Sequence, residues 1–223
     1  MEQPKKQIKG EIKYNVQLNE EQKHAKRLIL ENQIVIITGR AGSGKSLVGA
    51  ITALDLVFKK QYKKIIATRA LIEVGKSMGF LPGDAKDKFN PYMEALVENL
   101  YECYDHLKID EMVKDEVIKA YPVQFVRGKT MNEILIVEEA QNLTKDEMLA
   151  VVTRLGKFGK IIINGDQAQR DTNESFTGLD YVIEMSKTVT KIHHIKLKEN
   201  HRSDLVGEML DYEYANNKKQ IIK

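Results

Sequence analysis

The sequence predicts an α/β fold with a mainly parallel central sheet. Short runs of apolar, often β-branched residues are the expected strands, and helical patterns lie between most of them, which favours βαβ units. A glycine-rich segment at residues 39–46 follows the first strand and precedes apolar residues at helical spacing. The expected strands are residues 34–38, 64–68, 123–126, 134–138, 161–164 and 194–197.

The remaining segments complete one predicted domain over residues 1–223, a length suited to a single α/β core. A helix is expected at Asn19–Glu31, before the first strand. Residues 85–121 are expected to form a helical insertion, with two amphipathic helices between residues 91 and 120. Its default role is a structural cover, and substrate binding is the alternative. Residues 216–223 form an Asn/Lys-rich tail whose end is expected to fray.

Residues 39–46 fit the pattern G-x-x-x-x-G-K-[ST] of a phosphate-binding P-loop. Its glycines allow backbone N–H groups to approach a polyphosphate at the positive end of a helix dipole. Lys45 is expected to reach the β- and γ-phosphates, and the Ser46 hydroxyl to bind Mg²⁺. A chance glycine-rich turn is the alternative, which the flanking strand and helix disfavour. The predicted nucleotide contacts are Gly39, Arg40, Ala41, Gly42, Ser43, Gly44, Lys45, Ser46 and Leu47.

Polar residues follow two further expected strands. Glu138 and Glu139 come after residues 134–137, where the first carboxylate is expected to hold Mg²⁺ and the second to orient or deprotonate the attacking water. Gln169 follows the strand at residues 161–164, and its amide suits a hydrogen bond to the γ-phosphate or the water. A solvated acidic pair and a surface turn are the respective alternatives. We therefore predict catalytic roles for Lys45, Glu139 and Gln169 and a metal role for Ser46 and Glu138.

Composition narrows the class of protein. The 35 basic and 32 acidic residues give a net charge of +3, which permits a nucleic-acid partner without arguing for one. The lone Cys103 excludes an internal disulfide and favours a reducing compartment. No apolar run approaches the length of a membrane-spanning helix, and the first residues lack the apolar core of a signal peptide. The expectation is a soluble, cytoplasmic protein without a membrane partner.

Several motifs occur in the order seen in superfamily 1 helicase motors. The chain resembles the PhoH-like family of P-loop ATPases more closely, over about residues 12–215. The segment Arg69–Asp84 is similar to that family's stretch after its second strand, and its Leu81–Asp84 region is more specific than the P-loop alone. A RecA-like P-loop domain is the fold that this resemblance implies. The other motifs that carry it are Leu18–Gln22, Gly39–Ser46, Glu138–Gln141, Gly165–Gln169 and Glu199–Ser203.

The resemblance also implies roles for single residues. Gln22 is expected to recognise adenine, since an amide can pair with both its N6 donor and its N7 acceptor; a helix-surface glutamine is the alternative. Arg202 is expected to contact the γ-phosphate as an arginine finger, against a structural ion pair. The family usually has Asp at the position of Glu138, so hydrolysis is expected to be slow. The basic residues expected to contact nucleic acid or a neighbouring subunit, or to form surface salt bridges instead, are Arg69, Arg127, Arg154 and Arg170.

These expectations support three functions. The first is Mg²⁺-dependent ATP hydrolysis coupled to binding, moving or remodelling single-stranded nucleic acid, with RNA favoured over DNA. Because one motor core cannot close against a second core in its own chain, a homohexameric ring is the preferred assembly. The second function is an ATP-dependent switch or adaptor that moves no strand. The third, a small-molecule kinase, lacks an obvious acceptor-binding lid.

Overall fold

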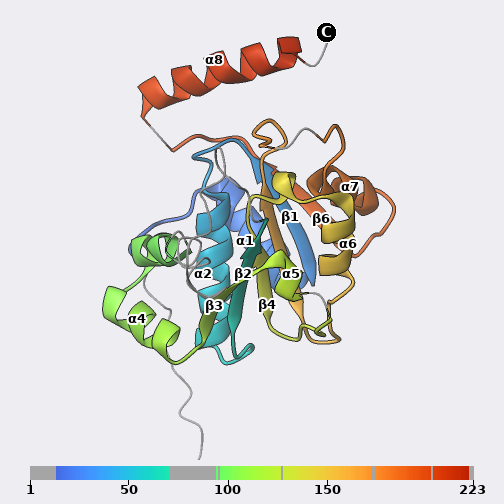
Figure 1. Cartoon of the computed structure of the whole chain (residues 1–223). Coiled ribbons are helices and arrows are strands. Elements are labelled where there is room, and N and C mark those ends of the chain that lie inside the picture. Colours follow the sequence, from blue (N-terminus) through green and yellow to red (C-terminus); the bar gives the residue numbers. More distant parts are fainter. Residues whose placement is uncertain are drawn as a thin grey trace, which may run out of the picture.

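A six-stranded parallel sheet forms the centre of the molecule (Figure 1). The computed structural model describes residues 14–70, 94, 96–126, 128–171, 174–201 and 203–220. The strand order is β3-β2-β4-β5-β1-β6, so β4, β5 and β1 are adjacent inner strands and their carboxyl ends are neighbours. The strands are β1 (Ile34–Gly39), β2 (Ile65–Arg69), β3 (Ile118–Pro122), β4 (Ile134–Val137), β5 (Lys160–Gly165) and β6 (Ile192–Leu197).

Helices cover both faces of the sheet because its central strands are apolar on both sides. Along β1, Val35 and Ile37 enter one core, while Ile34 and Ile36 enter the other. The first core is closed by α1 (Glu20–Glu31), α2 (Lys45–Phe58), a helix containing residues 96–103, and α4 (His106–Lys114). The second is closed by α5 (Val123–Val126), the 3₁₀ turn η1 (Ala140–Asn142), α6 (Lys145–Val152) and α7 (Gly178–Ser186).

The structure confirms the parallel α/β fold but corrects two local predictions. Residues 123–126 were expected to be a strand and instead form the short helix α5. The third strand is residues 118–122, so the helical insertion ends before Ile118. Ile118 and Val123 are both buried, and an apolar run this short does not distinguish a strand from a helical turn.

The helix boundaries follow local capping. Asn19 is the N-cap of α1, and its side chain and that of Gln22 each accept a hydrogen bond from the other's backbone N–H, which completes a capping box. At the other end of α1, the buried Lys160 amine donates to the carbonyls of Ile29 and Asn32. The final helix α8 (Asp204–Gln220) continues through residues 216–220, where fraying was expected, and stands above the sheet in Figure 1. Within the described residues, no helix has the length and apolar character needed to cross a bilayer.

Candidate nucleotide-binding site

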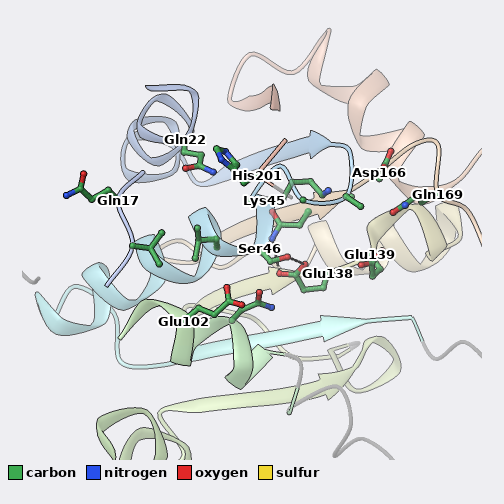
Figure 2. A pocket seen from close by; sticks show the side chains of 18 residues that line it. Gln17, Gln22, Lys45, Ser46, Glu102, Glu138, Glu139, Asp166, Gln169 and His201 are labelled. Carbon is green, nitrogen blue, oxygen red and sulfur yellow. Dashed lines mark hydrogen bonds between the residues drawn. The ribbon is translucent and has the colours of Figure 1, made fainter. Parts of the chain in front are cut away.

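A cavity of about 700 Å³ lies where the carboxyl ends of β1, β4 and β5 meet. Ligands bind at this edge in open parallel α/β sheets. The structure brings P-loop residues, both acidic residues and Gln169 to this cavity (Figure 2). Its lining side chains include Gln22, Lys45, Ser46, Leu47, Glu138, Glu139, Asn164, Asp166, Gln169 and His201.

The P-loop backbone has the conformation that its glycines allow. Gly44 has a φ of 81°, a left-handed backbone conformation that favours glycine, and a Cβ there would lie 2.4 Å from the Gln22 Nε2 atom. Helix α2 begins at Lys45, so the free N–H groups of its first turn face the cavity. The Lys45 amine donates to the carbonyls of Gly39 and Arg40 at 2.7 and 3.0 Å. These contacts hold a positive charge over the loop.

Glu138 is held between the P-loop and β5. Its carboxylate accepts hydrogen bonds from the Ser46 hydroxyl at 2.8 Å and from the Asn164 amide at 2.9 Å. Burial raises the pKa of Glu138, and the nearby Glu139 adds to this effect, whereas the two hydrogen bonds and Lys45 oppose it. The adjacent hydroxyl and carboxylate fit Mg²⁺, which binds few protein oxygens beside phosphate and water. Sequence reasoning missed Asn164.

Glu139 occupies a left-handed backbone conformation, with a φ of 50°. This is uncommon for a residue other than glycine and turns the chain sharply as it leaves β4. The Glu139 carboxylate accepts a hydrogen bond from the Gln141 amide. Figure 2 shows Glu139, Gln169 and Asp166 together on one side of the cavity. A carboxylate in this place can accept a proton from water.

The motif segment Glu199–Ser203, which lies far along the chain from the P-loop, contacts it through His201. The His201 backbone N–H donates to the Gly42 carbonyl at 3.0 Å, and Asn19 donates to Glu199 at 2.8 Å. The Gln22 amide donates to the Ser43 carbonyl at 3.2 Å. Three separate motifs are therefore linked by hydrogen bonds around the P-loop. Because Gln22 is buried and supports this loop, recognition of adenine by the same side chain stays a prediction.

Helix α8 contacts the site through two side chains. Arg40 pairs with Asp211, and its guanidinium lies 4.2 Å from the centre of the Tyr214 ring. The Tyr214 hydroxyl donates to the Asp166 carboxylate, and burial, followed by this contact, raises the pKa of Tyr214 to about 12. Tyr214 also lines a second cavity of about 320 Å³ that includes Glu139. Sequence reasoning gave α8 no role.

The arginines predicted to act have different surroundings. Arg127 and Arg202 lie outside the described residues. Arg69 ends β2 and is half-buried, and Arg154 is half-buried just after α6. Arg170 pairs with Asp180 at 3.0 Å and also donates to two backbone carbonyls, an arrangement typical of a structural ion pair. Roles for these arginines in nucleic-acid binding or assembly stay predictions.

Basic and aromatic side chains meet at the edge of the sheet, a grouping that the sequence did not reveal. Lys119 and Tyr121 are two positions apart on β3, so their side chains lie on the same face of the strand. Lys129 lies 5.6 Å from the centre of the Tyr121 ring. We call this small cavity the β3-edge groove, and its lining includes Lys64, Lys119, Tyr121, Phe125, Lys129 and one acid, Glu133.

The family model described as PhoH-like protein matches residues 16–213 of the chain. The chain belongs to this family. A PhoH-like protein from Mycobacterium bovis is 35% identical over 186 residues, which cover 81% of this chain and 52% of the relative. A PhoH-like protein from Bacillus subtilis is 34% identical over 184 residues, covering 81% and 58%. This PhoH-like chain thus spans about half the length of these curated relatives.

Solved structures share the fold of this PhoH-like chain. The UvsW helicase from bacteriophage T4 matches 81% of this chain and 60% of its own length, with a TM-score of 0.52 and 14% identity. The large terminase from a thermophilic bacteriophage matches 86% and 49%, with a TM-score of 0.53 and 10% identity. At identities this low, these likenesses show a shared fold.

Proposed function

We propose that this PhoH-like chain is a Mg²⁺-dependent ATPase that acts on single-stranded nucleic acid, with RNA favoured. One observation carries the ATPase proposal: Lys45, the Ser46–Glu138 pair and Glu139 line a single cavity at three adjacent strand ends. A phosphate-binding charge, hard oxygen ligands and a base are the groups that phosphoryl transfer to water requires.

Each residue has a distinct task in this mechanism. The P-loop N–H groups and Lys45 bind the phosphates, while Ser46 and Glu138 would hold Mg²⁺, which neutralises phosphate charge when bound. Glu139 orients the attacking water and accepts its proton, and Gln169 hydrogen-bonds the γ-phosphate. The bond from water oxygen to the γ-phosphorus forms as the bond to the β,γ-bridging oxygen breaks, giving ADP and phosphate. Positioning and charge neutralisation supply most of the catalysis.

Two observations favour nucleic acid over a partner protein. The motif order resembles that of helicase motors, and the β3-edge groove combines lysines with aromatic rings. Lysines suit phosphates and exposed rings stack on bases, a combination that binds single strands without base-specific contacts. Phe125, 53% exposed, is the ring most available for stacking. The alternative is an ATP-dependent switch. The contacts of α8 with Arg40 of the P-loop and with Asp166 favour it, because they link this site to a surface helix.

A homohexameric ring is the assembly that would complete this site, with Arg202 supplied to the γ-phosphate within one chain or by its neighbour. Mixing Arg202→Ala with Glu139→Gln subunits tests the arrangement. If Arg202 acts on a neighbour's site, mixed interfaces regain some intact sites and turnover partly returns. If it acts within its own chain, mixing recovers nothing.

ATP hydrolysis measured with and without single-stranded RNA and DNA, across protein concentration, tests the proposal as a whole. We expect stimulation by RNA and a rise in specific activity as subunits assemble. Lys45→Ala should abolish productive ATP binding, whereas Glu139→Gln should bind ATP without hydrolysing it. Unchanged turnover in both variants would reject the site. Turnover that ignores nucleic acid and concentration would favour the switch.

A further inference from the structure

We propose that Glu102 accepts a hydrogen bond from a ribose hydroxyl of the bound nucleotide and thereby makes the site prefer ribonucleotides over deoxyribonucleotides. This inference rests on the proposed ATP binding and adds a specificity residue to it. Glu102 belongs to the helix of residues 96–103, inside the segment that the sequence assigned mainly to structural cover. Together with Asn99, one turn earlier, it lines the nucleotide cavity.

The position of Glu102 follows from long-range contacts of its helix. The Asn15 backbone N–H donates to the Cys103 carbonyl at 3.0 Å, which fixes residues 14–17 beside the end of this helix. The Tyr14 hydroxyl donates to Asp55 of α2 at 2.6 Å, so the same segment is also attached to the P-loop helix. Glu102 therefore adjoins the wall of the cavity formed by Val16 and Gln17.

This wall lies at the end of the cavity away from the γ-phosphate. Figure 2 shows Gln17 far from Glu139 and Gln169, at the other end of the cavity that all three residues line. In Figure 2, Glu102 and Gln169 lie on opposite sides of the cavity, and the Glu102 carboxylate points toward the cavity. The nucleoside part of the ligand would consequently face Glu102.

The chemistry of a carboxylate selects the sugar. An ionised carboxylate accepts hydrogen bonds, donates none, and repels phosphate oxygens. The donors that an adenine nucleoside offers are the ribose hydroxyls and the 6-amino group. The sugar is attached to the α-phosphate and so lies nearest the first turn of α2, which carries Leu47 and packs in the same core as Leu100 and Cys103. The hydroxyls are thus nearer to Glu102 than the amino group at the far edge of the base.

Equilibrium binding of ATP, 2′-deoxy-ATP, 3′-deoxy-ATP and purine riboside triphosphate, which lacks the 6-amino group, tests the assignment. The wild-type chain is compared with Glu102→Met, which keeps the side-chain length and removes the acceptor. Glu98→Met is the matched control, since Glu98 is exposed one turn earlier on the same helix and does not line the cavity. A hydrogen bond to a charged group predicts that the wild type binds ATP about tenfold more tightly than at least one deoxy analogue.

Glu102→Met should lose about tenfold in ATP affinity, bind that deoxy analogue as before, and so bring the ratio close to one. Glu98→Met should retain the wild-type ratio. A ratio that survives in Glu102→Met would overturn the inference, as would a Glu102-dependent discrimination against the analogue without the amino group. Absence of ATP binding in the wild type would instead reject the proposed function on which the inference rests.

Discussion

The Gln141 amide donates a hydrogen bond of 2.5 Å to the Glu139 carboxylate, two residues earlier in the chain. The Oε1 atom of the same Gln141 side chain accepts a hydrogen bond from the Asp166 backbone N–H at 2.9 Å. One buried side chain therefore links the end of β4 to the end of β5. The same side chain also fixes the carboxylate of Glu139, the candidate general base, which the backbone alone would leave free to rotate.

This link predicts that Gln141 is a positioning residue. Gln141→Met, of similar size but without the amide, should lower kcat roughly 10- to 150-fold, because a hydrogen bond to a charged group contributes about 1.5–3 kcal/mol. Single-turnover kinetics would measure the rate of hydrolysis, and ATP titration would measure the dissociation constant for ATP. ATP affinity should stay close to that of the wild type, since Gln141 makes no P-loop contact in the described structure. A loss of affinity with unchanged kcat would contradict the role.

From sequence alone, the resemblance to the PhoH-like family, which usually has Asp at the position of Glu138, predicts that Glu138→Asp is tolerated and raises the hydrolysis rate. The structure predicts a cost instead, because the longer side chain reaches both Ser46 and Asn164. A carboxylate one methylene shorter cannot keep both bonds without movement of the strand. We expect Glu138→Asp to need severalfold more Mg²⁺ for half-maximal hydrolysis. Unchanged Mg²⁺ dependence would show that the site adapts.

The β3-edge groove predicts a defect in strand binding. Phe125→Ala should weaken binding of a single-stranded oligonucleotide roughly 5- to 150-fold, since stacking contributes about 1–3 kcal/mol per base. Phe158→Ala is a matched control, because Phe158 is also exposed and has Lys157 5.5 Å from its ring centre but lies outside the groove. Fluorescence anisotropy at several salt concentrations would compare them. Equal affinity of both variants would exclude the groove as a strand site.

Helix α8 is predicted to depend on Tyr214 more than on Asp211. Asp211 is largely exposed, and surface ion pairs contribute little, whereas the half-buried Tyr214 hydroxyl bonds a carboxylate. Tyr214→Phe should therefore speed proteolytic release of α8 by about tenfold, and Asp211→Asn by less than threefold. Limited proteolysis monitored by mass spectrometry measures both rates. The reverse order would mean that the Arg40 pair holds the helix.

Lys160 predicts a pH dependence of folding. Burial lowers its pKa to about 8, whereas an unfolded lysine titrates near 10.4, so between these values the unfolded chain binds more protons. The free energy of unfolding contributed by this group should consequently rise with pH in this interval, by at most about 3 kcal/mol. Denaturant unfolding from pH 7 to 10.5 would show the stability of the wild type increasing relative to Lys160→Met. The exposed Lys157→Met serves as the control, and parallel curves for wild type and Lys160→Met would refute the effect.

Most of the sheet and of the phosphate end of the site could be predicted from the sequence, because both depend on local patterns. Apolar runs before Gly39 and Glu138 identify strands, and strand ends place the residues that follow at one edge. The exchange of strand and helix around residues 118–126 could not be predicted, since Ile118 and Val123 are both apolar and tertiary packing decides between the two structures.

The supporting residues of the site were harder to predict because their partners are distant in sequence. Asn164 bonds Glu138 across two strands, and Tyr214 reaches Asp166 over 48 positions. Nothing local distinguishes these side chains from ordinary core or surface residues. Glu102 likewise lies on an amphipathic helix that reads as structural cover, and only the packing of that helix on α2 brings it to the cavity.

The hydrogen bond from the Gln22 amide to the Ser43 carbonyl joins the side chain that is predicted to recognise adenine to the phosphate-binding loop. A base that forms a hydrogen bond with the Gln22 amide would shift the Ser43–Gly44 peptide that this amide contacts. The N–H groups that bind the phosphates would move with that peptide. A nucleotide with the wrong base would then be hydrolysed more slowly as well as bound more weakly. Base selectivity in this protein should accordingly be measured at saturating nucleotide, where differences in affinity vanish and only differences in the rate of hydrolysis remain.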